Sequence, residues 1–132
     1  FKKFSKIRNK NFKLHKKFFS KYPEIFIIPK IEKNVHTNFL AYPIILKKNK
    51  FFDRKKLQIY LEKNNIQTRP IFSGNILRHP AFSNLISKKN KLNSFKNADY
   101  IMKNGILIGC HQGLTKKNID YVHKKILRKL MN

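Results

Sequence analysis

The chain has 132 residues and a net charge of +25, and its length allows one domain with a modest core. It contains no apolar run near the roughly 20 residues of a membrane-spanning helix, and its basic first residues lack the apolar core of a signal peptide. Cys110 is the only cysteine, which excludes an intrachain disulfide and a cysteine metal cluster and fits a reducing cytoplasm. Because the sequence begins with Phe1 rather than methionine, we expect it to be part of a longer protein.

The positive charge has two interpretations. Lys and Arg side chains that neutralise phosphates release counterions, so a basic chain can bind nucleic acid. However, 26 of the 31 basic residues are Lys, whereas recognition of phosphates and guanines favours Arg, and the excess is spread along the chain. Lys, Asn, Ile and Phe make up over half of the residues, a bias typical of an A/T-rich coding sequence. We therefore interpret the charge mainly as solvated surface, with nonspecific affinity for polyanions at low salt.

The first 46 residues predict a helix, a short strand and a longer strand. Residues 1–19 place apolar side chains at loose helical intervals among lysines, which indicates an amphipathic helix that ends before Pro23. Such a helix could also lie on an anionic membrane, but its interrupted apolar face favours docking on protein. Residues 25–28 predict a short strand. Residues 39–46 predict the central strand of a sheet, although Pro43 cannot donate to a ladder and suits an edge or a bulge.

A strand–helix–strand unit follows. Asp53 is placed to cap a helix over residues 54–63. Residues 66–72 alternate apolar and polar side chains and predict the next strand. Ser73, Gly74 and Asn75 then break the pattern, and Arg78 and His79 follow as nitrogen donors beside the rigid Pro80. This stretch is either a ligand contact presented by a scaffold or an ordinary turn that contains an Arg and a His.

The last third predicts two further helices and a strand. Residues 81–85 suggest a turn of helix, and residues 86–93 read as flexible surface. Ser94 is expected to cap a helix over residues 95–103 that stops at Gly105. Residues 106–108 predict a buried strand, and Thr115 is expected to cap a final helix with the apolar stripe Ile119, Val122, Ile126, Leu127 and Leu130.

Few residues of the chain suggest chemistry. There is no Gly-rich phosphate cradle, no closely spaced acidic pair and no His-Glu-x-x-His motif. A self-contained hydrolase would have to use Cys110 and His111, but neighbours on a strand point to opposite faces and make a poor nucleophile–base pair unless the chain turns there. We expect Cys110 to be a small buried residue. His15 and His123 are expected to be solvated or packed on helices. His79 and His111 both lie where a predicted strand gives way to a loop, and such ends can converge on a ligand.

The order of three motifs resembles the carboxy-terminal domain of the DegT/StrS sugar aminotransferases. These motifs are FLAYPI, NIQTRPIFSGNILRHPAF and NADYIMKNGILIGCHQGLTKKNIDYV. Within that family, the pattern from Thr68 to Pro80 is most similar to the branch of 3-dehydratases that act on CDP-4-keto-6-deoxyglucose in lipopolysaccharide and O-antigen biosynthesis. The resemblance is continuous from about Phe39 to Leu127.

The resemblance implies an α+β fold, a small two-layer domain with a mainly antiparallel sheet covered by helices. It makes residues 1–20 the end of an inter-lobe helix and residues 21–132 the small domain of a cytoplasmic enzyme, expected to be a homodimer. Pyridoxal or pyridoxamine phosphate, a possible 2Fe–2S cluster and the catalytic residues would belong to a large domain upstream. The fragment alone is therefore expected to be inactive.

The resemblance also implies a site for a nucleotide-diphosphate sugar. The residues expected to face it are Arg69, Ser73, Gly74, Asn75, Arg78, His79 and His111, with Arg78 suited to the diphosphate. A structural role for Arg69 and a helix-capping role for His111 are the alternatives. For the whole protein, three alternatives to the dehydratase stay open: an aminotransferase for the same kind of sugar, a basic nucleic-acid-binding module and a noncatalytic partner subunit.

Overall fold

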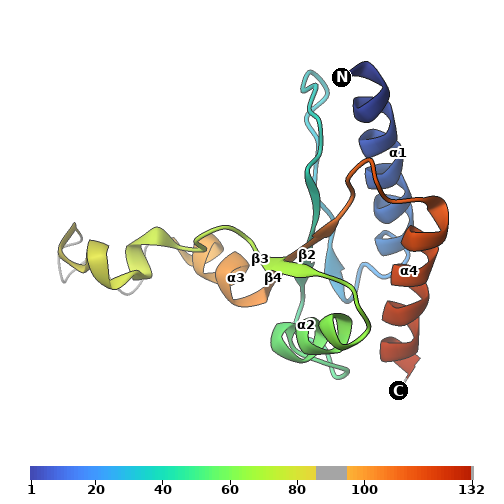
Figure 1. The fold of residues 1–132 in the computed structure, drawn as a ribbon. Helices are drawn as coiled ribbons and strands as arrows, with labels where there is room; N and C mark the ends of the chain where they lie inside the picture. Colours follow the sequence, from blue (N-terminus) through green and yellow to red (C-terminus); the bar gives the residue numbers. More distant parts are fainter. Residues whose placement is uncertain (86–94, 132) are drawn as a thin grey trace.

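Two strands in the middle of the sheet organise the fold (Figure 1). The computed structural model describes residues 1–85 and 95–131. Strands β2 (Ala41–Leu46) and β4 (Gly105–Gly109) pair antiparallel, with Ile44 opposite Ile106. Strand β1 (Phe26–Ile27) pairs with β2, and β3 (Thr68–Pro70) pairs with β4, which gives the order β1-β2-β4-β3. All neighbours are antiparallel, as expected for the α+β class.

Pro43 lies in a strand with neighbours on both sides, but at its own position the strand is paired on one side only. Strand β2 lies between β1 and β4, as predicted for the centre of the sheet. However, β1 pairs only with Ile45 and Leu46. Pro43 therefore has a ladder partner, Leu107, on one side alone. This agrees with the missing N–H of proline, which makes a position with two ladder partners unfavourable.

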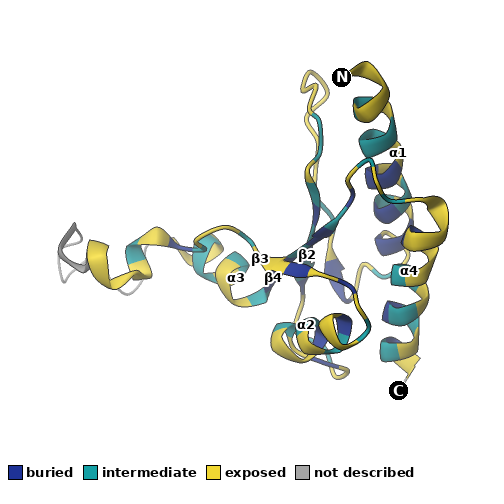
Figure 2. Cartoon of the chain, viewed as in Figure 1, coloured by how far each residue is buried: buried dark blue, intermediate teal, exposed yellow. Residues whose placement is uncertain are grey.

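One face of the sheet carries the core. Alternate side chains of β2 and β4 are buried beneath the helices, among them Tyr42, Ile44 and Ile108. Helices α1 (Lys2–Phe19) and α4 (Lys116–Met131) lie side by side on this face, and their buried residues complete the core together with Leu57 and Leu61 of the helix over residues 54–63 (Figures 1 and 2). The opposite face is only half-covered. We call it the open face, and its side chains are Ile27, Pro43, Ile45, Leu107 and Arg69.

Helix starts follow the predicted caps wherever the cap lies within the described residues. The Asp53 carboxylate accepts a hydrogen bond from the Lys56 amide (2.7 Å), and α2 (Arg54–Lys63) has the predicted bounds. At α4, the Thr115 hydroxyl accepts from the Asn118 amide (3.3 Å) and the Asn118 side chain accepts from the Thr115 amide (2.9 Å). Helix α3 (Lys96–Asn104) begins after Phe95, and the predicted cap Ser94 lies outside the described residues, as does the segment 86–93.

Strand β3 is shorter than the predicted strand over residues 66–72. It ends at Pro70, and a turn closed by the hydrogen bond from the Gly74 amide to the Ile71 carbonyl (3.1 Å) follows. The chain then leaves the sheet as an arm, by which we mean residues 71–82. The arm contains the 3-10 helix η1 (Ile76–Arg78) and the start of η2 (Pro80–Leu85), in agreement with the turn of helix predicted there. In Figure 1 the arm projects from the body past α3.

None of the described helices has both the length and the apolar character needed to cross a membrane.

Candidate functional site

Strand β3 places Arg69 on the open face of the sheet. The preceding residue, Thr68, points into the core, and its amide and hydroxyl both donate to the Glu62 carboxylate at 2.6 and 2.7 Å. These two bonds, and then the charge of Arg69, lower the pKa of Glu62. Because neighbours on a strand alternate in direction, Arg69 lies on the other face, opposite Leu107. Its guanidinium makes one hydrogen bond among the described residues, to the Thr68 carbonyl (3.2 Å), and the side chain is exposed.

The arm is held to α3 by Asp99. The Asp99 carboxylate accepts from Arg78 Nε at 2.9 Å and Arg78 Nη2 at 2.5 Å, and from the Asn75 side-chain amide at 2.7 Å. The bonds from Arg78 and Asn75 lower the pKa of Asp99 to about 2. Asn75 is buried, and its own Oδ1 accepts from the Leu77 amide (3.2 Å). Two nitrogens of Arg78 are therefore engaged within the chain, and the residue orients the arm.

Ser73, Gly74 and His79 shape the turn between β3 and η1. Gly74 has φ +66°, and a Cβ at this position would collide with the side chain of Met102 on α3. His79 Nε2 donates to the Ser73 carbonyl (2.7 Å), because a carbonyl can only accept. Position 74 therefore requires glycine, both because of its positive φ and because the arm packs closely on α3 there.

Phe72 is a residue of this site that the sequence did not reveal. Its backbone has φ 46°, a conformation that is rare and strained for a bulky side chain, and its ring is 84% exposed. It lies between Arg69 and Gly74, on the turn from β3 into the arm. A phenylalanine before Ser-Gly reads as the end of a strand, and no sequence signal indicates that it adopts a left-handed conformation.

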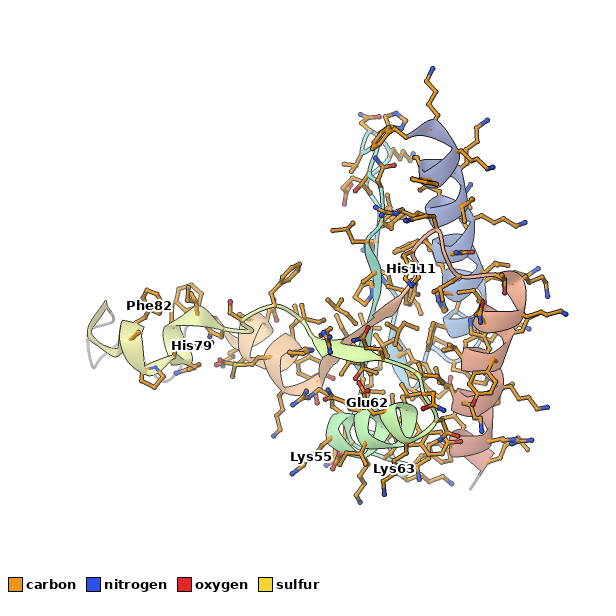
Figure 3. All side chains as sticks on the ribbon, in the orientation of Figure 1. Lys55, Glu62, Lys63, His79, Phe82 and His111 are labelled. Carbon is orange, nitrogen blue, oxygen red and sulfur yellow. The ribbon has the colours of Figure 1, made fainter. Side chains whose placement is uncertain are left out.

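His111 does not share a cavity with the arm. Strand β4 runs antiparallel to β3, so the end of β3 lies at the start of β4 and His111 follows the other end. The two ends are separated by the length of β4, about 13 Å at the usual rise per residue. Figure 3 shows His79 on the arm and His111 beside the body of the domain. His79 and His111 therefore do not converge, because β3 and β4 run antiparallel and place the two loops at opposite ends of β4.

His111 instead borders a separate small cavity. Its Nδ1 accepts from the Gly113 amide (3.2 Å), and its carbonyl accepts from the Asn11 side chain (3.0 Å). The cavity, of about 250 Å³, lies between the end of β4, the segment 65–67 and α4. Cys110, next to His111, is buried as predicted, and burial raises the pKa of its thiol to about 11. Of the two environments that the sequence allowed for His15 and His123, solvated or packed, the structure shows the packed one.

The residues of the candidate site do not fit pyridoxal phosphate. Such a site needs donors that cradle the phosphate and an acid against the pyridine nitrogen. The acid of this site, Asp99, is already held by Arg78 and Asn75, and Met102 occupies the space beside Gly74. The described residues also contain no group of three or more His, Cys, Asp or Glu side chains that could hold a metal ion. No catalytic step is therefore assigned to residues of this chain.

Comparison with known proteins gives the family. The model of the DegT/DnrJ/EryC1/StrS aminotransferase family matches residues 1–127. The chain belongs to this family. Its sequence is similar to the lipopolysaccharide biosynthesis protein RfbH of Salmonella typhimurium, with 31% identity over 89% of the chain and 26% of the relative. It is similar also to the dTDP-4-dehydro-2,6-dideoxy-D-glucose 3-dehydratase of Saccharopolyspora spinosa, with 28% identity over 93% of the chain and 26% of the relative.

Solved structures of a sugar-nucleotide dehydratase and of an aminotransferase share the fold. The Escherichia coli GDP-4-keto-6-deoxy-D-mannose-3-dehydratase with bound hydrated PLP superposes with a TM-score of 0.77 at 26% identity, over 93% of this chain and 31% of that one. An aminotransferase from Psychrobacter cryohalolentis has a TM-score of 0.78 over 93% of this chain and 33% of that one, and its 13% identity shows the fold alone. The chain thus corresponds to the carboxy-terminal lobe of the family, as its motifs predicted, and it spans about a quarter of the length of the curated relatives it matches.

Proposed function

We propose that this chain is the small lobe of a pyridoxal- or pyridoxamine-phosphate-dependent 3-dehydratase that acts on CDP-4-keto-6-deoxyglucose in O-antigen biosynthesis. The observation that carries the proposal is the similarity to RfbH and to the Saccharopolyspora 3-dehydratase over about nine-tenths of the chain. Helix α1 would then end the connection between the lobes, and residues 21–132 would form the small domain. The cofactor and the catalytic groups would be supplied by a large lobe, in an enzyme that we place in the cytoplasm as a homodimer.

Arg69 and the arm give the small lobe its part in binding. Arg69 presents a guanidinium, with most of its donors unused within the described residues, on an otherwise apolar sheet face. Such a group suits a diphosphate, because its planar fork binds phosphate oxygens in pairs. Arg78 and Asn75 orient the arm through Asp99, while Ser73, Gly74 and His79 hold its turn. Arg78 was expected to suit the diphosphate; we infer instead that it positions the arm and that Arg69 is the stronger candidate for the diphosphate.

An aminotransferase for a nucleotide-linked 4-keto sugar is the second candidate. The description of the matching family model as an aminotransferase family favours it. The two reactions differ in product: a dehydratase removes the hydroxyl at C3, whereas an aminotransferase adds nitrogen at C4.

The decisive experiment expresses the complete reading frame that encodes this chain and incubates the purified protein with CDP-4-keto-6-deoxyglucose, excess pyridoxamine phosphate as the amino donor and a two-electron reductant. Mass spectrometry of the product is the measurement. Loss of the C3 oxygen, with no nitrogen gained, supports the dehydratase. Gain of an amino group without loss of that oxygen supports the aminotransferase and overturns the dehydratase. If the frame encodes no upstream domain, both proposals fail in favour of a partner or binding module.

A further inference from the structure

A cavity of about 610 Å³ lies between α1 and the loop of residues 31–39. In Figure 1 this loop runs beside α1 toward the N-terminal end of the helix. The cavity shares no lining residue with Arg69, the arm or His111. It is lined by Ser5, Asn9, Phe12, Lys13, Lys16, Ile31, Val35, His36, Thr37, Asn38 and Phe39. Its volume lies within the range of small-molecule sites, about 300–1,000 Å³.

The cavity has an aromatic floor. The rings of Phe12 and Phe39 stack with their centroids 3.6 Å apart and their planes at 16°. Phe12 is buried, whereas Phe39 is half-buried. Ile31 and Val35 add exposed apolar side chains along the loop. A flat apolar group could therefore lie against Phe39 and remove this surface from water.

One wall of the cavity is positively charged. Lys13 and Lys16 lie about one turn apart on α1, and the ammonium group of neither makes a hydrogen bond or ion pair among the described residues. The lining contains no carboxylate. The next groove along α1 is lined by Lys6, Lys10 and Lys17, which extend the positive charge. This field attracts an anion, and two neighbouring ammonium groups favour a dianion over a single carboxylate.

The polar end of the cavity is fixed by the chain itself. The Ser5 hydroxyl donates to the Asn38 side-chain oxygen, which ties the loop to α1 across the cavity. The Asn9 side chain donates to the Ser5 carbonyl (3.0 Å) and holds the same corner. The Ser5–Asn38 bond and the Phe12–Phe39 stack hold the loop against α1, so binding in the cavity costs little ordering of the loop.

We propose that this cavity binds a small phosphate monoester that carries a flat ring. The phosphate lies between Lys13 and Lys16, and the ring lies against Phe39 and Val35. His36 and Thr37 supply further polar contacts at the rim. The proposal does not rest on the sugar-nucleotide function, because no residue is shared between the two sites.

The test is a titration of the complete protein that contains this chain, followed by NMR of its backbone amides, with adenosine 5′-monophosphate, ribose 5-phosphate and inorganic phosphate as probes. We expect adenosine 5′-monophosphate to bind most tightly and to shift the amides of residues 5–16 and 31–39. The double variant Lys13→Gln/Lys16→Gln is expected to weaken this binding at least about tenfold, the equivalent of one lost charge-assisted contact. Val35→Glu, at an exposed position, places a negative charge in the cavity and is expected to weaken binding similarly.

The matched control is Lys55→Gln/Lys63→Gln on α2, which removes the same charge away from α1 (Figure 3). We expect it to leave the affinity within about twofold. If both double variants weaken binding equally, the anion is held only by the net charge of the chain and the proposal is wrong. It is equally overturned if inorganic phosphate binds as tightly as adenosine 5′-monophosphate, since the ring then contributes nothing, or if the amides of residues 5–16 and 31–39 do not shift at millimolar probe.

Discussion

Tyr42 carries a hydroxyl group that has no hydrogen-bond partner among the described residues, although the side chain is buried. It lies on the core face of β2, against the rings of Phe12, His15 and Phe19. Burial raises its pKa above the range in which tyrosine normally ionises. A buried polar group without a partner costs about 1–3 kcal/mol of stability, whereas the ring itself fills the core.

Removal of this hydroxyl is therefore expected to stabilise the fold. We predict that Tyr42→Phe raises the free energy of unfolding in urea by about 1 kcal/mol. The control Tyr22→Phe, at a half-buried ring on the edge of the core, is expected to change it by less than about 0.5 kcal/mol. A loss of stability in Tyr42→Phe would mean that the hydroxyl is bonded in the folded protein.

Among the secondary-structure elements, local sequence signals predict the helix bounds but not the direction of the arm. The bounds of α2 follow from the Asp53 cap and from the polar pair Asn64-Asn65, all within one short stretch. The direction of the arm depends on Asp99, which lies 21 residues beyond Arg78 and pairs with it only in the folded chain. Strand β3 was predicted too long because alternation continues through Phe72, while the turn at Ile71–Gly74 already ends the ladder.

The sequence grouped seven residues into one candidate site, whereas the antiparallel pairing of β3 and β4 separates His111 from the other six. Arg69 and the arm residues lie at one end of β4, and His111 lies at the other. Sequence patterns predict where strands end, but they do not say which strands become neighbours, and so they do not place each loop at one end of the sheet or the other. The left-handed backbone conformation of Phe72 also depends on tertiary structure, because such a conformation persists only where the surrounding structure holds it.

The anchor of the arm gives the prediction at this scale. Asp99→Asn removes the charge that holds Arg78 and weakens the bond from Asn75, so the arm should open more often. We expect cleavage after Arg78 by an arginine-specific protease to become about tenfold faster, with an unchanged midpoint of global unfolding. The control Asp120→Asn breaks an exposed ion pair with Lys116 on α4 and should leave the cleavage rate at Arg78 unchanged. Equal rates in the two variants would show that Asp99 does not anchor the arm.

On the scale of the whole molecule, a pair of histidines joins α1, α4 and the end of β4. His15 Nε2 donates to the Gly109 carbonyl (3.1 Å), so its Nδ1 accepts from His123 Nε2 (3.0 Å). His123 also stacks on Phe18, with ring centroids 4.0 Å apart. Burial lowers the pKa of both histidines from 6.5 to about 4, because the charged forms lose their hydration.

This pair makes stability depend on pH. The unfolded chain binds protons at these histidines near pH 6.5 and the folded chain only near pH 4, so the stabilisation is complete above pH 6.5 and is lost as the pH falls toward 4. His15 alone accounts for about 3 kcal/mol across this window. Urea unfolding from pH 7 to pH 4 measures it: His15→Gln should flatten the decrease, whereas His36→Gln, on the exposed loop, should not. An equal decrease in both variants would assign the effect to other groups.

If this chain is the lobe that binds a nucleotide-diphosphate sugar through Arg69, as we propose, then the KM of the complete enzyme for CDP-4-keto-6-deoxyglucose depends on this guanidinium. Arg69→Gln should raise KM at least about tenfold, because a charge-assisted contact to the diphosphate is worth more than about 1.4 kcal/mol. The matched variant Arg128→Gln, which removes an exposed guanidinium from α4, should leave KM within about twofold. If the two variants have the same KM, Arg69 does not bind the substrate and the claim is contradicted.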